Sequence, residues 1–205
     1  MNFTTVIVSD SKKIDQLSKK KFFLKKPANK NLSVIHSNKF NDIHHVVFNI
    51  EDEYVVSTMK LGPQFNFPYS SLINTFYKHN SKLLLIEHEN VSFNQIIMDE
   101  LINNLKINAE VKQFDNKDFL NIIIFFKGTI KKIEYTNKDD EFISLDFVNL
   151  DKLHTIVEED NSLDFLTINF EDRYLSVWKD GKISIDNNDE KYLIGVVERL
   201  FMCIY

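Results

Sequence analysis

The chain has 205 residues, of which 43% are hydrophobic and 27% are charged, but it contains only four glycines and three prolines. At average usage, a chain of this length carries about fourteen glycines and about ten prolines. The shortage argues against phosphate-cradling loops, nucleophile elbows and dinucleotide-binding motifs, because each of these depends on glycine. The single cysteine, Cys203, excludes an intrachain disulfide.

The formal net charge of −5 is unevenly spread along the chain. Residues 11–30 contain eight lysines and one aspartate, whereas residues 134–190 contain sixteen acidic and five basic residues. Such an asymmetry informs about partners and not about fold. It fits either a solvated basic helix with an acidic surface elsewhere, or a basic surface that faces an acidic polymer.

The N-terminal residues lack the basic stretch and long apolar run of a signal peptide. The longest central apolar stretch, residues 122–126, is far shorter than the ~20 residues that span a bilayer. We therefore expect an intracellular protein without a membrane partner. Abundant lysine, asparagine, isoleucine and phenylalanine indicate AT-rich codons, which favours a virus, a phage or an AT-rich bacterium as the source. The expected location is the cytoplasm of a bacterial host, or the host cytoplasm or nucleus for a eukaryotic virus.

The first part of the chain predicts strands interrupted by two helices. Residues 4–9 alternate and are β-branched, which indicates a strand, and a basic helix is expected over 11–20. Pro68 and the apolar spacing after it predict a second helix over 68–79. The acidic run at 51–53 predicts a turn. Further strands are expected at 32–36, 44–50, 54–61 and 82–87.

The second part begins with a capping box, Ser92-x-x-Gln95, which predicts a helix over 92–106. A polar turn joins strands expected at 109–114 and 119–126, and Lys127-Gly128 predicts a tight hairpin turn. Asp180-Gly181 is the strongest hairpin signal in the chain. The other elements expected are strands at 129–135, 141–147, 163–170, 173–178 and 182–185, and helices at 149–159 and 189–204.

Written coarsely, a strand, a helix and two or three further strands recur four times, which predicts a stacked or pseudo-symmetric architecture. The expected fold class is α+β, with largely antiparallel sheets, helices on one face and a C-terminal helix. Two domains are expected, the halves 1–90 and 91–205, the second of which includes that helix.

Two stretches resemble the DNA sliding clamps, the family of the eukaryotic proliferating-cell nuclear antigen and of phage clamp proteins. Residues 54–90 (YVVSTMKLGPQFNFPYSSLINTFYKHNSKLLLIEHEN) resemble a strand, a helix and a return strand of a clamp. Residues 142–185 (FISLDFVNLDKLHTIVEEDNSLDFLTINFEDRYLSVWKDGKISI) resemble its closing unit. The TATA-binding protein is a competing pseudo-symmetric fold, whose spacing fits less closely.

The resemblance implies a non-enzymatic, clamp-like accessory factor of viral or phage DNA replication or transcription. Clamp helices offer basic side chains to duplex phosphate without reading bases, in a contact that weakens with salt. A polymerase or another protein is the expected partner, and a homo-oligomer stays open. The lysines at matching helix positions are Lys12, Lys13, Lys19, Lys20, Lys78, Lys106 and Lys152.

The alternative function is an acidic protein-interaction module, of the inhibitor or immunity type, that docks on a basic partner through residues 134–190. An enzyme ranks third: Asp180-x-Lys182 matches part of one nuclease motif, but Asp-Gly also serves a hairpin turn. The six histidines form no spaced motif, so neither a metal nor another cofactor is expected. Phe22-Phe23, set among lysines, fits either a core strand or a stacking site for single strands.

Overall fold

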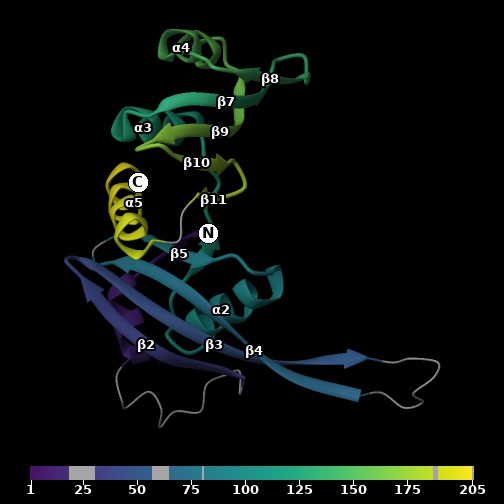
Figure 1. Ribbon diagram of the computed structural model, residues 1–205, viewed down its shortest axis with the longest axis vertical. Helices are drawn as coiled ribbons and strands as arrows, with labels where there is room; N and C mark the ends of the chain where they lie inside the picture. The colour runs from purple at the N-terminus through teal and green to yellow at the C-terminus, as the bar shows by residue number, and fades with distance from the viewer. Residues whose placement is uncertain (19–30, 57–64, 80, 187–188, 205) are drawn as a thin grey trace.

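A computed structural model describes residues 1–18, 31–56, 65–79, 81–186 and 189–204 (Figure 1). These residues form an α+β fold around one antiparallel sheet of eleven strands, and the last element is a helix. The predicted fold class is thereby confirmed. The strands are β1 (Asn2–Val8), β2 (Leu32–Phe40), β3 (Ile43–Val56), β4 (Phe65–Lys78), β5 (Leu83–Glu87), β6 (Ala109–Val111), β7 (Thr129–Thr136), β8 (Phe142–Asp146), β9 (Ser162–Phe170), β10 (Arg173–Trp178) and β11 (Lys182–Ile185).

Helices cover the sheet and connect its strands. A short 3-10 helix, η1, runs directly into α1, whereas the later helices are longer, and α3 and α5 pack against each other. In the described part of the chain, no helix combines the length and apolar character needed to cross a membrane. The helices are η1 (Ser11–Ile14), α1 (Asp15–Ser18), α2 (Val91–Asn103), α3 (Asn116–Phe126), α4 (Leu150–Glu158) and α5 (Glu190–Cys203).

β1 lies at the centre of the sheet, whose order is β2-β3-β4-β5-β1-β11-β10-β9-β7-β8. β5 pairs along one edge of β1, while β11 and β6 share the other edge. The first strand of the chain is therefore paired to segments more than 75 residues away in the sequence. The division of the chain at residue 90 stays a prediction.

Two hydrophobic cores meet at the central strands. The four residues Leu83–Ile86 of β5 are all buried, and alternate residues contribute to different cores. Leu83 and Leu85 join the core that α3, α4 and α5 cover, and Leu84 and Ile86 join the core that α2 covers. Such a continuous apolar run is expected of a strand that is buried on both faces.

The predicted helix over 68–79 is wrong, because this segment belongs to β4. Fourteen residue pairs join β4 to β3, and burial alternates from Ser71 to Thr75, with Leu72 exposed between buried neighbours. Phe76 and Tyr77 are both buried, in different cores. β-branched residues favour a strand, and the long pairing outweighs the local helical spacing. Because β3 runs on to Val56, the predicted turn at 51–53 is also wrong.

The predicted strand over 119–126 is a helix, α3. The polar residues taken for a turn form its capping box: Asp115 accepts a hydrogen bond from the Asp118 backbone N–H at 2.9 Å, and Asp118 accepts one from the Asp115 backbone N–H at 3.1 Å. Lys127, with φ of 52°, ends the helix in the left-handed region. The predicted hairpin at Lys127-Gly128 is therefore a helix end instead.

The predicted hairpin at Asp180-Gly181 is confirmed. Gly181 has φ of +90°, and its backbone N–H donates to the Trp178 carbonyl at 3.0 Å. The helices expected over 92–106, 149–159 and 189–204 correspond to α2, α4 and α5. In the basic helix expected over 11–20, η1 and α1 cover residues 11–18, and the last two positions lie outside the described residues.

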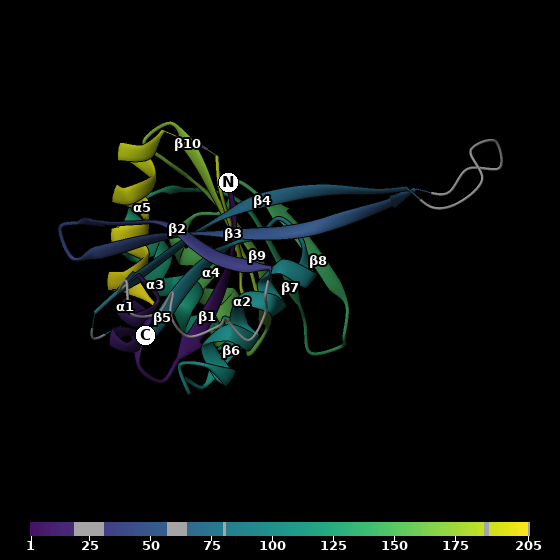
Figure 2. The same ribbon diagram turned by 90° about the horizontal axis from the view of Figure 1, so that it is seen from below.

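β3 and β4 extend beyond the rest of the sheet as a two-stranded ribbon, seen at the right of Figures 1 and 2. β2 pairs with β3 only as far as Ile50, and β5 pairs only with Thr75–Tyr77 of β4. From Glu51 onward, β3 therefore has β4 as its sole described strand partner. The ribbon ends where the described residues stop, at Val56 and Phe65.

Candidate functional site

Four of the lysines predicted to contact phosphate belong to segments that meet at η1. The Ser11 hydroxyl donates a hydrogen bond to the backbone carbonyl of Lys78 at 3.0 Å. The Lys13 ammonium donates one to the backbone carbonyl of Lys106 at 3.4 Å. The ends of β4 and of the segment after α2 thereby lie against η1. We call Lys12, Lys13, Lys78 and Lys106 the basic corner.

The side chains of the basic corner reach solvent. Lys12 and Lys106 are exposed, whereas Lys13 and Lys78 are half-buried. Asp42 is the acidic neighbour of Lys78, with its carboxylate 4.0 Å from the ammonium. Because such an exposed pair contributes at most about 1 kcal/mol, it leaves the Lys78 ammonium available to a stronger anion.

The remaining predicted lysines are not placed in this corner. Lys152 is exposed on α4. In Figure 1, α3 and α5 lie between α4 and the purple N-terminal helix. Lys19 and Lys20 lie outside the described residues. The first helix and the segment after α2 thus lie against each other, whereas the fourth helix lies elsewhere. Lys78 ends a strand and Lys106 follows α2, so neither stands on a helix, where the resemblance places them.

Lys82 is a basic residue near the corner that the sequence analysis missed. It is exposed, and its backbone carbonyl accepts a hydrogen bond from Val8 at 2.7 Å. Together with Lys78 and His79 it lines a pocket of about 520 Å³, which the C-terminal residues Phe201 and Ile204 close on its apolar side. Lys82 stands four positions after Lys78 and directly before β5.

A cluster of ionisable side chains lies beside the basic corner. Asp15, the first residue of α1, places one carboxylate oxygen 2.8 Å from His79 Nε2 and the other 3.5 Å from His44 Nδ1. The two imidazole rings stack with centroids 4.0 Å apart. We call Asp15, His44 and His79 the histidine–aspartate cluster. Its members come from α1, β3 and the residue after β4.

Tyr77 supports this cluster from beneath. Its hydroxyl donates a hydrogen bond to Asp15 at 2.6 Å, and its ring stacks on His44 with centroids 4.9 Å apart. Burial, together with the bond to Asp15, raises the pKa of Tyr77. It therefore stays a protonated donor at neutral pH.

The environment also sets the charge of the cluster. Burial alone would raise the pKa of Asp15, but the hydrogen bond from Tyr77 and the proximity of His79 outweigh it, so that pKa is lowered. Burial, and then the neighbouring His79, lower the pKa of His44. At neutral pH the cluster therefore combines an ionised carboxylate with a neutral His44 imidazole.

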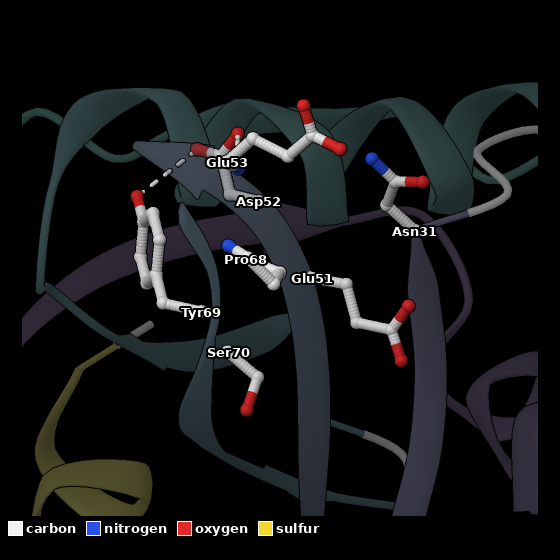
Figure 3. A pocket seen from close by; sticks show the side chains of 7 residues that line it. All are labelled: Asn31, Glu51, Asp52, Glu53, Pro68, Tyr69 and Ser70. Carbon is white, nitrogen blue, oxygen red and sulfur yellow. Dashed lines mark hydrogen bonds between the residues drawn. The ribbon is translucent and has the colours of Figure 1, made fainter. Parts of the chain in front are cut away.

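The β3–β4 ribbon carries a surface of a different kind. Glu51, Asp52 and Glu53 are exposed on β3, opposite Pro68 and Tyr69 of β4. Figure 3 shows these side chains around an open pocket of about 370 Å³, with the Tyr69 hydroxyl bonded to Asp52 at 3.0 Å. The acidic run that the sequence analysis took for a turn is thus displayed along a projecting strand.

Acidic residues between 134 and 190 are in part engaged by local bases. Asp164 lies 3.1 Å from the Lys179 ammonium, and Asp180 lies 2.7 Å from that of Lys182. Asp180 therefore lies in a hairpin turn and pairs with Lys182, two positions further along the chain. These pairs reduce the local charge of the surface through which the alternative function would act.

Models of known protein families and curated protein sequences give no match to this chain.

Proposed function

We propose that this protein is a non-enzymatic, clamp-like accessory factor of viral or phage DNA replication or transcription. In this proposal the basic corner contacts the phosphate backbone of duplex DNA without reading bases. The observation that supports the proposal is that the segments carrying Lys12, Lys13, Lys78 and Lys106 meet at η1. Ser11 bonds to the Lys78 backbone carbonyl and Lys13 to that of Lys106. Clustered ammonium groups bind the phosphate backbone by releasing condensed counterions, whatever the base sequence.

Two features of the chain support this function. Residues 19–30, which follow α1 directly, contain six lysines and no acidic residue, so the basic charge continues from the corner along the sequence. Residues 142–185 form a strand, a helix and three strands, β8, α4, β9, β10 and β11. This is the element order that the resemblance implies for the closing unit of a clamp.

The test compares two variants that remove the same charge from different places. The first carries Lys12→Gln, Lys13→Gln, Lys78→Gln and Lys106→Gln. The control removes four exposed lysines elsewhere: Lys117→Gln, Lys127→Gln, Lys138→Gln and Lys152→Gln. Binding to fluorescent duplexes of two unrelated sequences is measured by anisotropy at low salt.

We expect the wild type and the control to bind both duplexes alike, and the corner variant to bind at least tenfold more weakly. An equal loss in the two variants would show that net charge alone matters. A clear preference for one duplex would contradict binding through phosphate.

The second candidate is the acidic protein-interaction module, and the ribbon favours it. Glu51, Asp52 and Glu53 lie near the exposed aromatic rings of Phe67 and Tyr69, which are 57% and 40% exposed. Exposed aromatic residues are enriched at protein interfaces. The test is a pull-down at low salt with the wild type and with a variant that carries Glu51→Gln, Asp52→Asn and Glu53→Gln. This candidate is favoured over the first if the wild type recovers one basic protein and no DNA, and if the variant loses that protein.

A further inference from the structure

The histidine–aspartate cluster offers three metal-binding side chains from three separate segments. One ligand atom each from Asp15, His44 and His79 lies within 4.8 Å of the other two. Two imidazoles and one carboxylate form a donor set that suits Zn²⁺ and related first-row cations. This chemistry is independent of the phosphate contact proposed above.

The separations need little adjustment to hold a cation. Ligand atoms bound to Zn²⁺ at 2.0–2.2 Å in a tetrahedron lie about 3.3 Å apart. The carboxylate of Asp15 is already 2.8 Å from His79 and 3.5 Å from His44. The three ligand atoms lie within 4.8 Å of one another, and the stacked rings must rotate to turn one nitrogen of each towards the same point.

One imidazole nitrogen of the cluster has no hydrogen-bond partner among the described residues. His44 Nε2 is buried and has no hydrogen-bond partner among the described residues. His79 Nε2, by contrast, lies 2.8 Å from the Asp15 carboxylate and pairs with it. Buried polar atoms are usually paired, so His44 keeps one unsatisfied nitrogen, which is not the Nδ1 that faces Asp15.

Tyr77 supplies the outer support that metal ligands commonly have. Its hydroxyl holds one carboxylate oxygen of Asp15 and its ring packs on His44, so that a single buried side chain orients two of the three ligands. Groups of this kind fix the ligands, and their loss costs 10–100-fold in metal affinity. His79 also lines the pocket beside Lys78 and Lys82, which gives a cation a path from solvent.

We propose that Asp15, His44 and His79 bind one divalent transition-metal cation, of which Zn²⁺ is the best match, with at least one coordination position left to solvent. The cation would join α1 to the ends of β3 and β4. It would thereby fix the helix from which the lysine-rich residues 19–30 continue.

The test measures Zn²⁺ binding to metal-stripped full-length protein by calorimetry and by metal analysis after gel filtration. The variants are His44→Gln, His79→Gln and Tyr77→Phe. The control is His154→Gln, which changes a half-buried histidine on α4. Circular dichroism of each variant confirms that it folds, and binding of Co²⁺ with its visible absorption reports the coordination directly.

We expect one Zn²⁺ per chain in the wild type and in the His154→Gln control. Affinity should fall at least tenfold in either cluster variant and about tenfold in Tyr77→Phe, whose ligands are intact. The proposal is overturned if the wild type shows no saturable binding, or if His44→Gln and His79→Gln bind Zn²⁺ as the wild type does. Neither result bears on DNA binding by the basic corner, which is measured separately.

Discussion

Among single residues, two glycines of this glycine-poor chain have different physical roles. A Cβ added at Gly128 would lie 2.8 Å from the backbone carbonyl oxygen of Asn169 and 3.2 Å from Ile168. Gly128 therefore allows β9 to approach the end of α3. A Cβ added at Gly195, inside α5, would meet nothing within 4 Å. The first glycine is required by packing, and the second only weakens its helix.

Gly195→Ala should therefore stabilise the protein. Glycine in a helix interior costs about 1 kcal/mol relative to alanine, and the added methyl group has free space. We expect the free energy of unfolding, measured by urea denaturation, to rise by about 1 kcal/mol. Gly128→Ala is the matched comparison and should lower it by about 1–3 kcal/mol, because the methyl group overpacks the site. A loss of stability in Gly195→Ala would contradict the open space around α5.

Cys203 should be chemically inert in the folded protein. Burial raises the pKa of its thiol to about 12, and its exposed fraction is 3%. The reactive form is the thiolate, which a raised pKa makes scarce at every pH below about 12. We expect iodoacetamide at pH 8 to modify Cys203 only after unfolding in urea, as measured by mass spectrometry. Fast modification of the native protein would show that the C-terminal end of α5 opens.

Among the secondary-structure elements, α3 shows how a correct local signal can be assigned to the wrong structure. Asp115 and Asp118 were taken for a turn between strands, although the same spacing forms a capping box. The buried residues Phe119, Ile122 and Ile123 follow helical spacing, and the run of β-branched and aromatic side chains masked it. The capping box was the signal that could have decided the assignment.

Asp115→Ala should accordingly destabilise the fold through α3. The substitution removes the side chain that accepts the Asp118 backbone N–H, and loss of an N-cap costs about 1 kcal/mol, within a range of 0.5–2. Asp139→Ala, in an exposed turn, should change the free energy of unfolding by less than about 0.5 kcal/mol. Equal effects of the two substitutions in chemical denaturation would argue against the capping box.

For β4, by contrast, no local sequence signal was sufficient to predict a strand. Leu72, Ile73, Phe76 and Tyr77 have the spacing of a helix, and Pro68 suits a first helical turn. The fourteen-residue pairing with β3 decides the structure, and such pairing between distant segments is not encoded in a local window. The fold class and the helices α2, α4 and α5 could be predicted because their periodicity agrees with their packing. The capping box predicted at Ser92 is wrong, since Asn90 caps α2.

In the whole molecule, the candidate sites depend on contacts between remote segments. Ser11 and Lys78 are 67 positions apart in the sequence, and Lys13 and Lys106 are 93 apart. The sequence analysis named these lysines from a resemblance, but it placed Lys152 with them. It also expected no metal site, because Asp15, His44 and His79 form no spaced motif. Only the pairing of β3 with β4 and the position of η1 and α1 bring each set together.

The central claim is that the basic corner contacts duplex phosphate, and its most direct test is the salt dependence of DNA binding. The logarithm of the association constant falls with the logarithm of salt concentration, with a slope of about −0.9 for each phosphate contact. Removing Lys12, Lys13, Lys78 and Lys106 should therefore reduce the slope by up to about 3.6. The control without Lys117, Lys127, Lys138 and Lys152 should keep the wild-type slope. Identical slopes in the wild type and the corner variant would contradict the claim.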